Sequence, residues 1–145
     1  MAIRSHTESN GTMRLRVLLV DDSRDFLVAF SRFVSTLDNV EVVGQAHGGL
    51  DALTQAATLQ PDLILLDITM PVFNGLEVAR CIQGWPHAPR IVFLSMHDNA
   101  AYREVAAEAG AVDYVNKEDV TDKLPPILER LLAAKILLYA GQSTR

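Results

Sequence analysis

The sequence predicts an α/β fold, a doubly wound parallel sheet of five strands with helices on both faces. From Leu15 onward, short apolar runs alternate with longer segments whose apolar residues recur at helical spacing. This alternation implies parallel strands joined by right-handed crossovers. Several of the runs are almost continuously apolar, as strands buried on both faces are. The 145 residues correspond to one domain with a sizeable core.

Five apolar runs are the expected strands, and their composition predicts the strand order. They span residues 15–20, 40–46, 63–66, 91–94 and 112–115. The first, third and fourth runs are nearly all apolar, whereas the second and fifth are shorter or contain polar residues, which is typical of edge strands. Strands one, three and four are therefore expected in the centre. The predicted order is 2-1-3-4-5, with the switch point between strands one and three.

Helices are expected between and after the strands. The first carries Phe26, Phe30, Phe33, Val34 and Leu37 on one face, and Ser23 or Asp22 can cap its start. The second helix carries Leu50, Leu53 and Ala57 and ends before Pro61. The third runs from after Asn74-Gly75 to near Gly84. The fourth covers roughly residues 98–109, and the last covers about 121–139. Pro125 and Pro126 fit only the first turn of that last helix.

Composition and chain ends exclude several classes of protein. Residues 1–13 are expected to form a flexible tail, 14–139 the domain, and 140–145 a linker stub. The net charge of -5 argues against nucleic-acid binding by this domain. No apolar run reaches the ~18 residues of a membrane span, and the N-terminus has no signal-peptide core. The lone Cys81, expected to be buried or half-buried on the third helix, suits a cytoplasmic protein.

Polar side chains follow four of the predicted strands. Asp21 and Asp22 end the first strand, Asp67 the third and Ser95 the fourth, and Lys117 follows the fifth. Ligands of open α/β sheets bind at this carboxyl edge. Clustered carboxylates resist ionisation, and a divalent cation such as Mg²⁺ removes that difficulty. A carboxylate beside Mg²⁺ and a lysine can act as a nucleophile toward phosphorus and form an acyl phosphate.

These segments resemble the receiver domain of two-component response regulators. The resemblance covers roughly residues 14–139 and is carried by LLVDDS (18–23), LLDITMPVFNG (65–75), FLSMHD (93–98) and AVDYVNK (111–117). It implies a flavodoxin-like (βα)5 fold. The LSMHD stretch resembles most the NarL/FixJ-type subgroup, whose members usually carry a LuxR-type helix-turn-helix output domain.

The resemblance implies a role for each residue of the edge. Asp67 would be the phosphoacceptor and, with Lys117, catalytic in the domain's own phosphorylation. Mg²⁺ would be held by Asp21, Asp22, Asp67 and the backbone carbonyl of Thr69. Ser95 would be the switch hydroxyl, Lys117 the phosphate-side lysine and Tyr114 the switch aromatic. For Tyr114, a half-buried edge aromatic is an equally good interpretation.

One position departs from the family pattern. Proline usually follows the lysine in this family, often after a cis bond, whereas Glu118 follows Lys117 here. A cis bond before a residue other than proline costs about 3 kcal/mol, which leaves the geometry of this loop open. Thr69 and His97 lie two residues after Asp67 and Ser95, where family members tune the lifetime of the acyl phosphate.

Three functional hypotheses follow. The first is a phosphorylation-dependent receiver, not a metabolic enzyme, with a sensor histidine kinase as partner and transcription regulation as output of a longer, DNA-binding protein. The second is a pseudo-receiver, a phosphorylation-independent interaction module. The third is a small hydrolase or phosphatase with Asp67 as nucleophile, against which Thr69 and the short chain count.

The last helix is apolar on more than one face. Its apolar residues are Ile127, Leu128, Leu131, Leu132, Ile136, Leu137, Leu138 and Tyr139. One face must cover the sheet, and the surplus fits a dimer surface or a seat for another domain. A few exposed leucines at a helix end are also normal. The two candidate homodimer surfaces are therefore this helix and the face formed by helix four, strand five and helix five.

Overall fold

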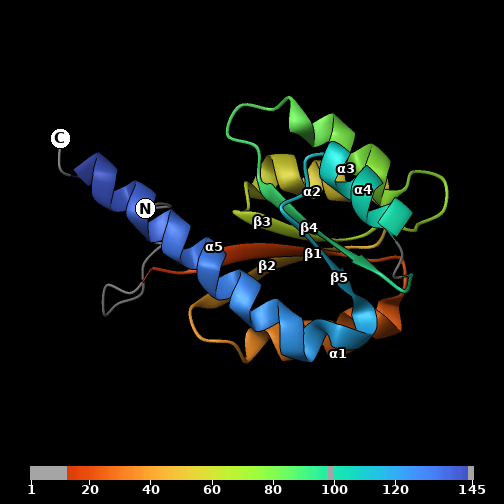
Figure 1. The fold of residues 1–145 in the computed structure, drawn as a ribbon, viewed down its shortest axis with the longest axis horizontal. Helices are drawn as coiled ribbons and strands as arrows, with labels where there is room; N and C mark the ends of the chain where they lie inside the picture. The colour runs from red at the N-terminus through yellow and green to blue at the C-terminus, as the bar shows by residue number, and fades with distance from the viewer. Residues whose placement is uncertain (1–12, 98–99, 144–145) are drawn as a thin grey trace.

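A computed structural model describes residues 13–97 and 100–143. Strands and helices alternate along the chain (Figure 1). The strands are β1 (Leu15–Val20), β2 (Val40–Ala46), β3 (Leu63–Asp67), β4 (Arg90–Ser95) and β5 (Asp113–Asn116). The helices are α1 (Arg24–Ser35), α2 (Gly49–Leu59), α3 (Gly75–Gln83), α4 (Ala100–Glu108) and α5 (Val120–Ser143), and a 3₁₀ turn, η2 (Lys117–Asp119), precedes α5.

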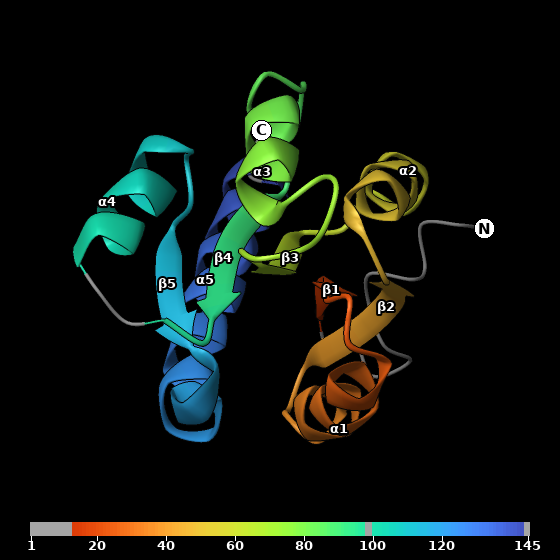
Figure 2. The same ribbon diagram turned by 90° about the vertical axis from the view of Figure 1, so that its right-hand side faces the viewer.

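The five strands form one parallel sheet in the order β2-β1-β3-β4-β5, which confirms the predicted order (Figure 2). Its registers align the carboxyl ends of the strands. Val20 pairs with Leu66, so the chain leaves β1 and β3 side by side. Ser95 pairs with Asn116, so β4 and β5 also end together. The topology alone therefore brings four chain segments to one edge.

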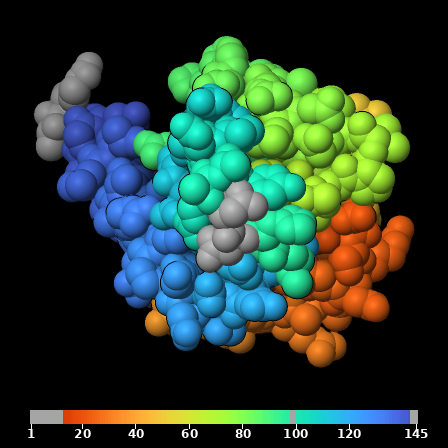
Figure 3. All heavy atoms as spheres, turned by 45° about the vertical axis from the view of Figure 1, so that its right-hand side comes forward, coloured from red at the N-terminus to blue at the C-terminus, as the bar shows by residue number. Residues whose placement is uncertain are grey.

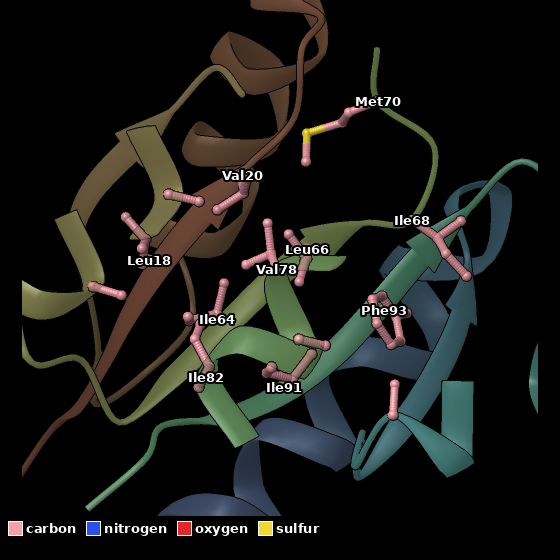
Figure 4. Close-up of a cluster of buried hydrophobic side chains, with 14 of the residues drawn as sticks. Leu18, Val20, Ile64, Leu66, Ile68, Met70, Val78, Ile82, Ile91 and Phe93 are labelled. Atoms are coloured by element: carbon pink, nitrogen blue, oxygen red, sulfur yellow. The ribbon is translucent and has the colours of Figure 1, made fainter. Parts of the chain in front are cut away.

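Two hydrophobic clusters lie on opposite faces of the sheet. Alternate residues of β3 point to opposite faces, with Ile64 and Leu66 in one cluster and Leu63 and Leu65 in the other. Helices α2, α3 and α4 cover the first cluster, part of which Figure 4 shows, and α1 and α5 cover the second. All five residues of β3 are buried, as its apolar composition predicts.

Several predicted bounds differ from the structure by one residue. β3 includes Asp67, β4 includes Arg90 and Ser95, and β5 begins at Asp113 and ends at Asn116. The polar strand ends lack the apolar side chains on which the prediction relied, yet their backbones still pair across the sheet. Of the predicted fourth helix, residues 98–99 lie outside the described part of the chain, as do residues 1–12 of the predicted tail.

Helix α5 is longer than predicted and projects beyond the sheet (Figures 1 and 3). It begins at Val120 and continues through Ser143, so Pro125 and Pro126 lie in its second turn and the expected end at Tyr139 is wrong. Residues 144–145 lie outside the described part. No helix among the described residues combines the length and apolarity that crossing a membrane requires.

A buried lysine ties the far part of α5 to the amino ends of the strands. The ammonium of Lys135 donates to the carbonyl of Arg14 at 2.7 Å and to Oδ2 of Asp62 at 2.8 Å. The same Asp62 oxygen accepts from the backbone N–H of Arg16 at 2.7 Å. These non-local bonds anchor α5 near residue 135 to the amino ends of β1 and β3.

Local hydrogen bonds cap the first turns of α1 and α3, the helices that follow β1 and β3. The hydroxyl of Ser23 accepts from the N–H of Phe26 and caps α1, as predicted. Asn74 and Glu77 form a capping box at the start of α3. Cys81 on α3 is exposed, so the expectation that it is buried or half-buried is wrong. The apolar stripe of α3 uses its neighbours Val78, Ala79 and Ile82 instead.

Gly75 lets α3 start directly against the end of β3. A Cβ at this position would collide with the carbonyl oxygen of Asp67 and lie 2.9 Å from Cα of Ile68. The backbone N–H of Gly75 also donates to the carbonyl of Ile68 at 3.2 Å. A glycine is therefore needed to hold the end of β3 in place.

We expect Gly75→Ala to destabilise the protein by about 1–3 kcal/mol, because backbone atoms must move to admit the methyl group. Chemical denaturation measures the change. Gly84→Ala is the matched control at the other end of α3, where a Cβ would meet nothing within 4 Å. Equal stability of the Gly75→Ala and Gly84→Ala proteins would contradict the packing argument.

Candidate functional site

Three carboxylates meet at the carboxyl ends of β1 and β3. Asp21 and Asp22 follow β1, and Asp67 is the last residue of β3. One carboxylate oxygen from each of the three lies within 4.8 Å of the others. Asp21 and Asp67 are buried, whereas Asp22 is exposed. Three oxygen donors, two of them shielded from water, form a set that suits a hard divalent cation such as Mg²⁺.

Lys117 reaches the same cluster from the end of β5. Its ammonium lies 2.6 Å from Oδ2 of Asp21 and 3.6 Å from Oδ1 of Asp67. Its side chain is only 11% exposed, so the attraction is weakly screened by water. The lysine therefore supplies one positive charge to a cluster that contains three acidic groups.

The loop after Lys117 resolves the geometry that Glu118 left open. The described part of the chain contains no cis peptide bond. Instead, Lys117 begins the η2 turn, and the side chain of Asn116 accepts from the N–H of Glu118 at 2.9 Å. A capped 3₁₀ turn therefore places the lysine without a proline.

Burial and repulsion raise the pKa of Asp67 from its ordinary value of 3.8 to about 7. The largest cause is desolvation, followed by repulsion from Asp21, while attraction to Lys117 and the hydrogen bond from the N–H of Thr69 act in the opposite direction. A cation bound to the cluster would favour the ionised form. The three carboxylates fit Mg²⁺.

Backbone N–H groups orient two of the carboxylates. The N–H of Ser23 donates to Oδ1 of Asp21 at 2.8 Å, and the N–H of Thr69 donates to Oδ1 of Asp67 at 3.2 Å. In each bond, the N–H two residues after the aspartate donates to its side chain, so the chain forms a tight turn at the end of each strand. The loop containing Thr69 is therefore fixed beside the cluster.

Ser95 and Tyr114 lie at the neighbouring strand ends. Ser95 is fully buried, one residue beyond the partner of Asp67 in β4, and its hydroxyl oxygen accepts from the N–H of His97 at 2.9 Å. The Tyr114 side chain is also buried, and its hydroxyl donates to the carbonyl of His97 at 2.5 Å. Both side chains thus hold the loop after β4.

Sequence reasoning missed several residues around the site. The Phe26 ring, assigned only to the core face of α1, has the Lys117 ammonium 4.4 Å from its centroid. The Arg103 guanidinium lies 4.9 Å from the centroid of the Tyr114 ring, and Tyr102 stacks on His97 at 5.3 Å. For Phe26, its position in the first turn of α1, just after the acidic pair, was a sequence feature that could have placed it near the site.

The raised pKa of Asp67 predicts how stability depends on pH. Between 3.8 and about 7 the folded protein binds more protons at this group than the unfolded chain does, so its stability falls as the pH rises through this window. Asp67→Asn removes the effect. Without metal, we expect the stability advantage of Asp67→Asn over the wild type to grow by about 2–4 kcal/mol from pH 4 to pH 7.5.

Urea denaturation at a series of pH values in the presence of a chelator measures this difference. Asp38→Asn, which removes an exposed carboxyl group from the turn before β2, controls for a general change in charge. An Asp67→Asn advantage that is the same at pH 4 and pH 7.5 would show that Asp67 ionises normally.

The sequence matches a known protein family and resembles curated proteins. The family described as the response regulator receiver domain matches residues 17–129. A curated relative, protein-glutamate methylesterase/protein-glutamine glutaminase 5 of Myxococcus xanthus, is 40% identical over 134 residues. The match covers 90% of this chain but 38% of that relative. The chain thus spans well under half the length of this curated relative.

Solved structures share the fold. The response regulator domain of Thermotoga maritima CheB is 32% identical, with a TM-score of 0.73 over 83% of this chain and 96% of that one. The receiver domain of the response regulator NarL from Mycobacterium tuberculosis is 30% identical, with a TM-score of 0.75 over 81% of this chain and 96% of that one. Sequence, strand order and fold agree, and the chain belongs to the response regulator receiver domain family.

Proposed function

We propose that the chain is a phosphorylation-dependent signalling receiver in which a histidine kinase donates a phosphoryl group to Asp67. The observation that carries the proposal is the meeting of Asp21, Asp22, Asp67 and Lys117 at one sheet edge. The two strand-end turns orient Asp21 and Asp67 in advance, and the η2 turn fixes the backbone at Lys117. Such preorganisation is what phosphoryl transfer requires of a protein.

The carboxylate of Asp67 is the proposed nucleophile. An oxygen of this group would attack phosphorus while the bond to the donor's nitrogen or oxygen breaks, and the product is an acyl phosphate. Lys117, which already lies 3.6 Å from Oδ1 of Asp67, would neutralise charge on the transferred group. Mg²⁺ bound by Asp21, Asp22, Asp67 and the carbonyl of Thr69 would supply further positive charge at the phosphoryl oxygens.

The signal would leave the site through Ser95 and Tyr114. Both side chains now hold the loop after β4 through bonds to His97. A phosphoryl group on Asp67 offers oxygens that can accept from the Ser95 hydroxyl, and rotation of this side chain toward them would weaken its bond from the N–H of His97. The bond of Tyr114 to the same residue would then be free to rearrange and bias the surface of α4, β5 and α5.

The target of this signal is a separate question from the phosphorylation site. The LSMHD stretch led us to expect transcription regulation through a LuxR-type domain, but the curated relative described above is a methylesterase, which does not support that expectation. We propose that phosphorylation acts on a separate output domain or partner, and that a methylesterase domain is the better candidate. A phosphorylation-independent interaction module is the alternative, favoured only by the missing proline after Lys117.

Intact-mass spectrometry after incubation with Mg²⁺ and acetyl phosphate tests the proposal. We expect one phosphoryl adduct on the wild type and none on Asp67→Asn, because the amide cannot form the acyl phosphate. Beryllofluoride binding distinguishes an unreactive protein from one whose acyl phosphate decays quickly. A protein with neither adduct nor beryllofluoride binding would contradict the receiver proposal and favour the interaction module.

Mg²⁺ affinity gives an independent test of the acidic cluster. We expect Asp22→Asn to weaken Mg²⁺ binding by about tenfold or more, because one charged oxygen ligand is lost. Isothermal titration calorimetry measures the affinity. Asp25→Asn is the matched control, since Asp25 is exposed in the first turn of α1 but is not part of the cluster. Equal losses in the Asp22→Asn and Asp25→Asn proteins would indicate a non-specific charge effect.

A further inference from the structure

The ammonium of Lys117 is enclosed on three sides. Asp21 lies 2.6 Å away, Asp67 lies 3.6 Å away, and the ring centroid of Phe26 lies 4.4 Å away. The two carboxylates come from β1 and β3, whereas the ring comes from α1. A cation this close to an aromatic ring is attracted by the negative face of the ring, and the attraction is stronger where water is excluded.

Without the ring, the position of the Lys117 ammonium would depend on its flexible side chain and on the two carboxylates. Lysine carries its charge on a four-carbon stem with several rotamers. The η2 turn orients the backbone at Lys117 but not the end of its side chain. Of the two carboxylates, Asp21 holds the ammonium more closely, although Asp67 is the proposed acceptor. A contact from a third direction limits how far the ammonium can swing away from Asp67.

The Phe26 ring is itself fixed in place. The N–H of Phe26 donates to the capping hydroxyl of Ser23, which follows the acidic pair directly. The ring stacks on Phe30 with centroids 5.0 Å apart, and it packs against the cluster under α1 and α5. The ring therefore belongs to α1, which begins at the site, and its packing restricts its movement.

We propose that Phe26 is a positioning residue for phosphoryl transfer, which holds the Lys117 ammonium beside Asp67 through the face of its ring. This inference rests on the proposed receiver function. The ring takes no part in bond making. It keeps the lysine charge where the phosphoryl oxygens arrive, in a chain whose loop after the lysine contains no proline and no cis bond.

The decisive test changes the electronics of the ring without changing its shape. Replacing Phe26 by 3,4,5-trifluorophenylalanine withdraws charge from the ring face and largely preserves packing. We expect the rate of Asp67 phosphorylation by acetyl phosphate to fall by about three- to tenfold, with mono- and difluorinated rings in between. Phe26→Leu should show a similar loss, and Phe26→Tyr should retain the wild-type rate.

Two readouts separate positioning from structural damage. Mg²⁺ affinity and thermal stability of the trifluorinated protein should match the wild type, because the carboxylates are untouched and the ring largely keeps its shape. In the metal-free protein, NMR should show the side-chain protons of Lys117 shifted by the ring current of Phe26, with the shift absent in Phe26→Leu. Phe33→Leu, at another half-buried phenylalanine of α1, is the matched control and should leave the phosphorylation rate unchanged.

The outcomes distinguish this inference from the receiver proposal itself. A wild type that takes no phosphoryl group and binds no beryllofluoride overturns the receiver proposal. A wild type that is phosphorylated, with a rate that does not change across the fluorinated series, overturns the role of Phe26 alone. Loss of rate together with loss of Mg²⁺ affinity would also overturn it, because the acidic cluster would then have been disturbed.

Discussion

Electrostatic repulsion among Asp21, Asp22 and Asp67 is the constraint on which the rest of the site depends. The registers of the sheet force these carboxylates together, and burial raises the cost of ionising Asp67. A protein would not keep such a cluster for stability alone, since a buried charge without sufficient compensation destabilises the fold. The surrounding structure supplies part of the compensation, through Lys117 and two backbone N–H groups, and a cation bound at the cluster would supply more.

The same sheet edge connects this charge to the loop after β4. Ser95 ends β4 beside β3, and Tyr114 lies on β5, so both side chains are one or two strands away from Asp67. Their bonds converge on the backbone of His97. A change in charge at Asp67 can therefore act on one short loop, which is a simple route from chemistry to a surface.

The strand order and the polar edge could be predicted from the sequence because they follow from local patterns. Buried strands have nearly uninterrupted apolar runs, and parallel strands end at the same edge. The parts that could not be predicted depend on contacts distant in sequence. The anchoring of α5 by Lys135 requires Arg14 and Asp62, and the contact between Phe26 and Lys117 joins residues 91 positions apart.

The central claim is that Asp67 is held in a site that disfavours its charge until a cation binds. NMR titration of the Asp67 carboxyl carbon, with and without Mg²⁺, tests this claim most directly. The account predicts titration at a pH of about 7 in the metal-free protein and a marked fall in this pKa when Mg²⁺ is present. Titration near the ordinary value of 3.8, unaffected by Mg²⁺, would contradict it.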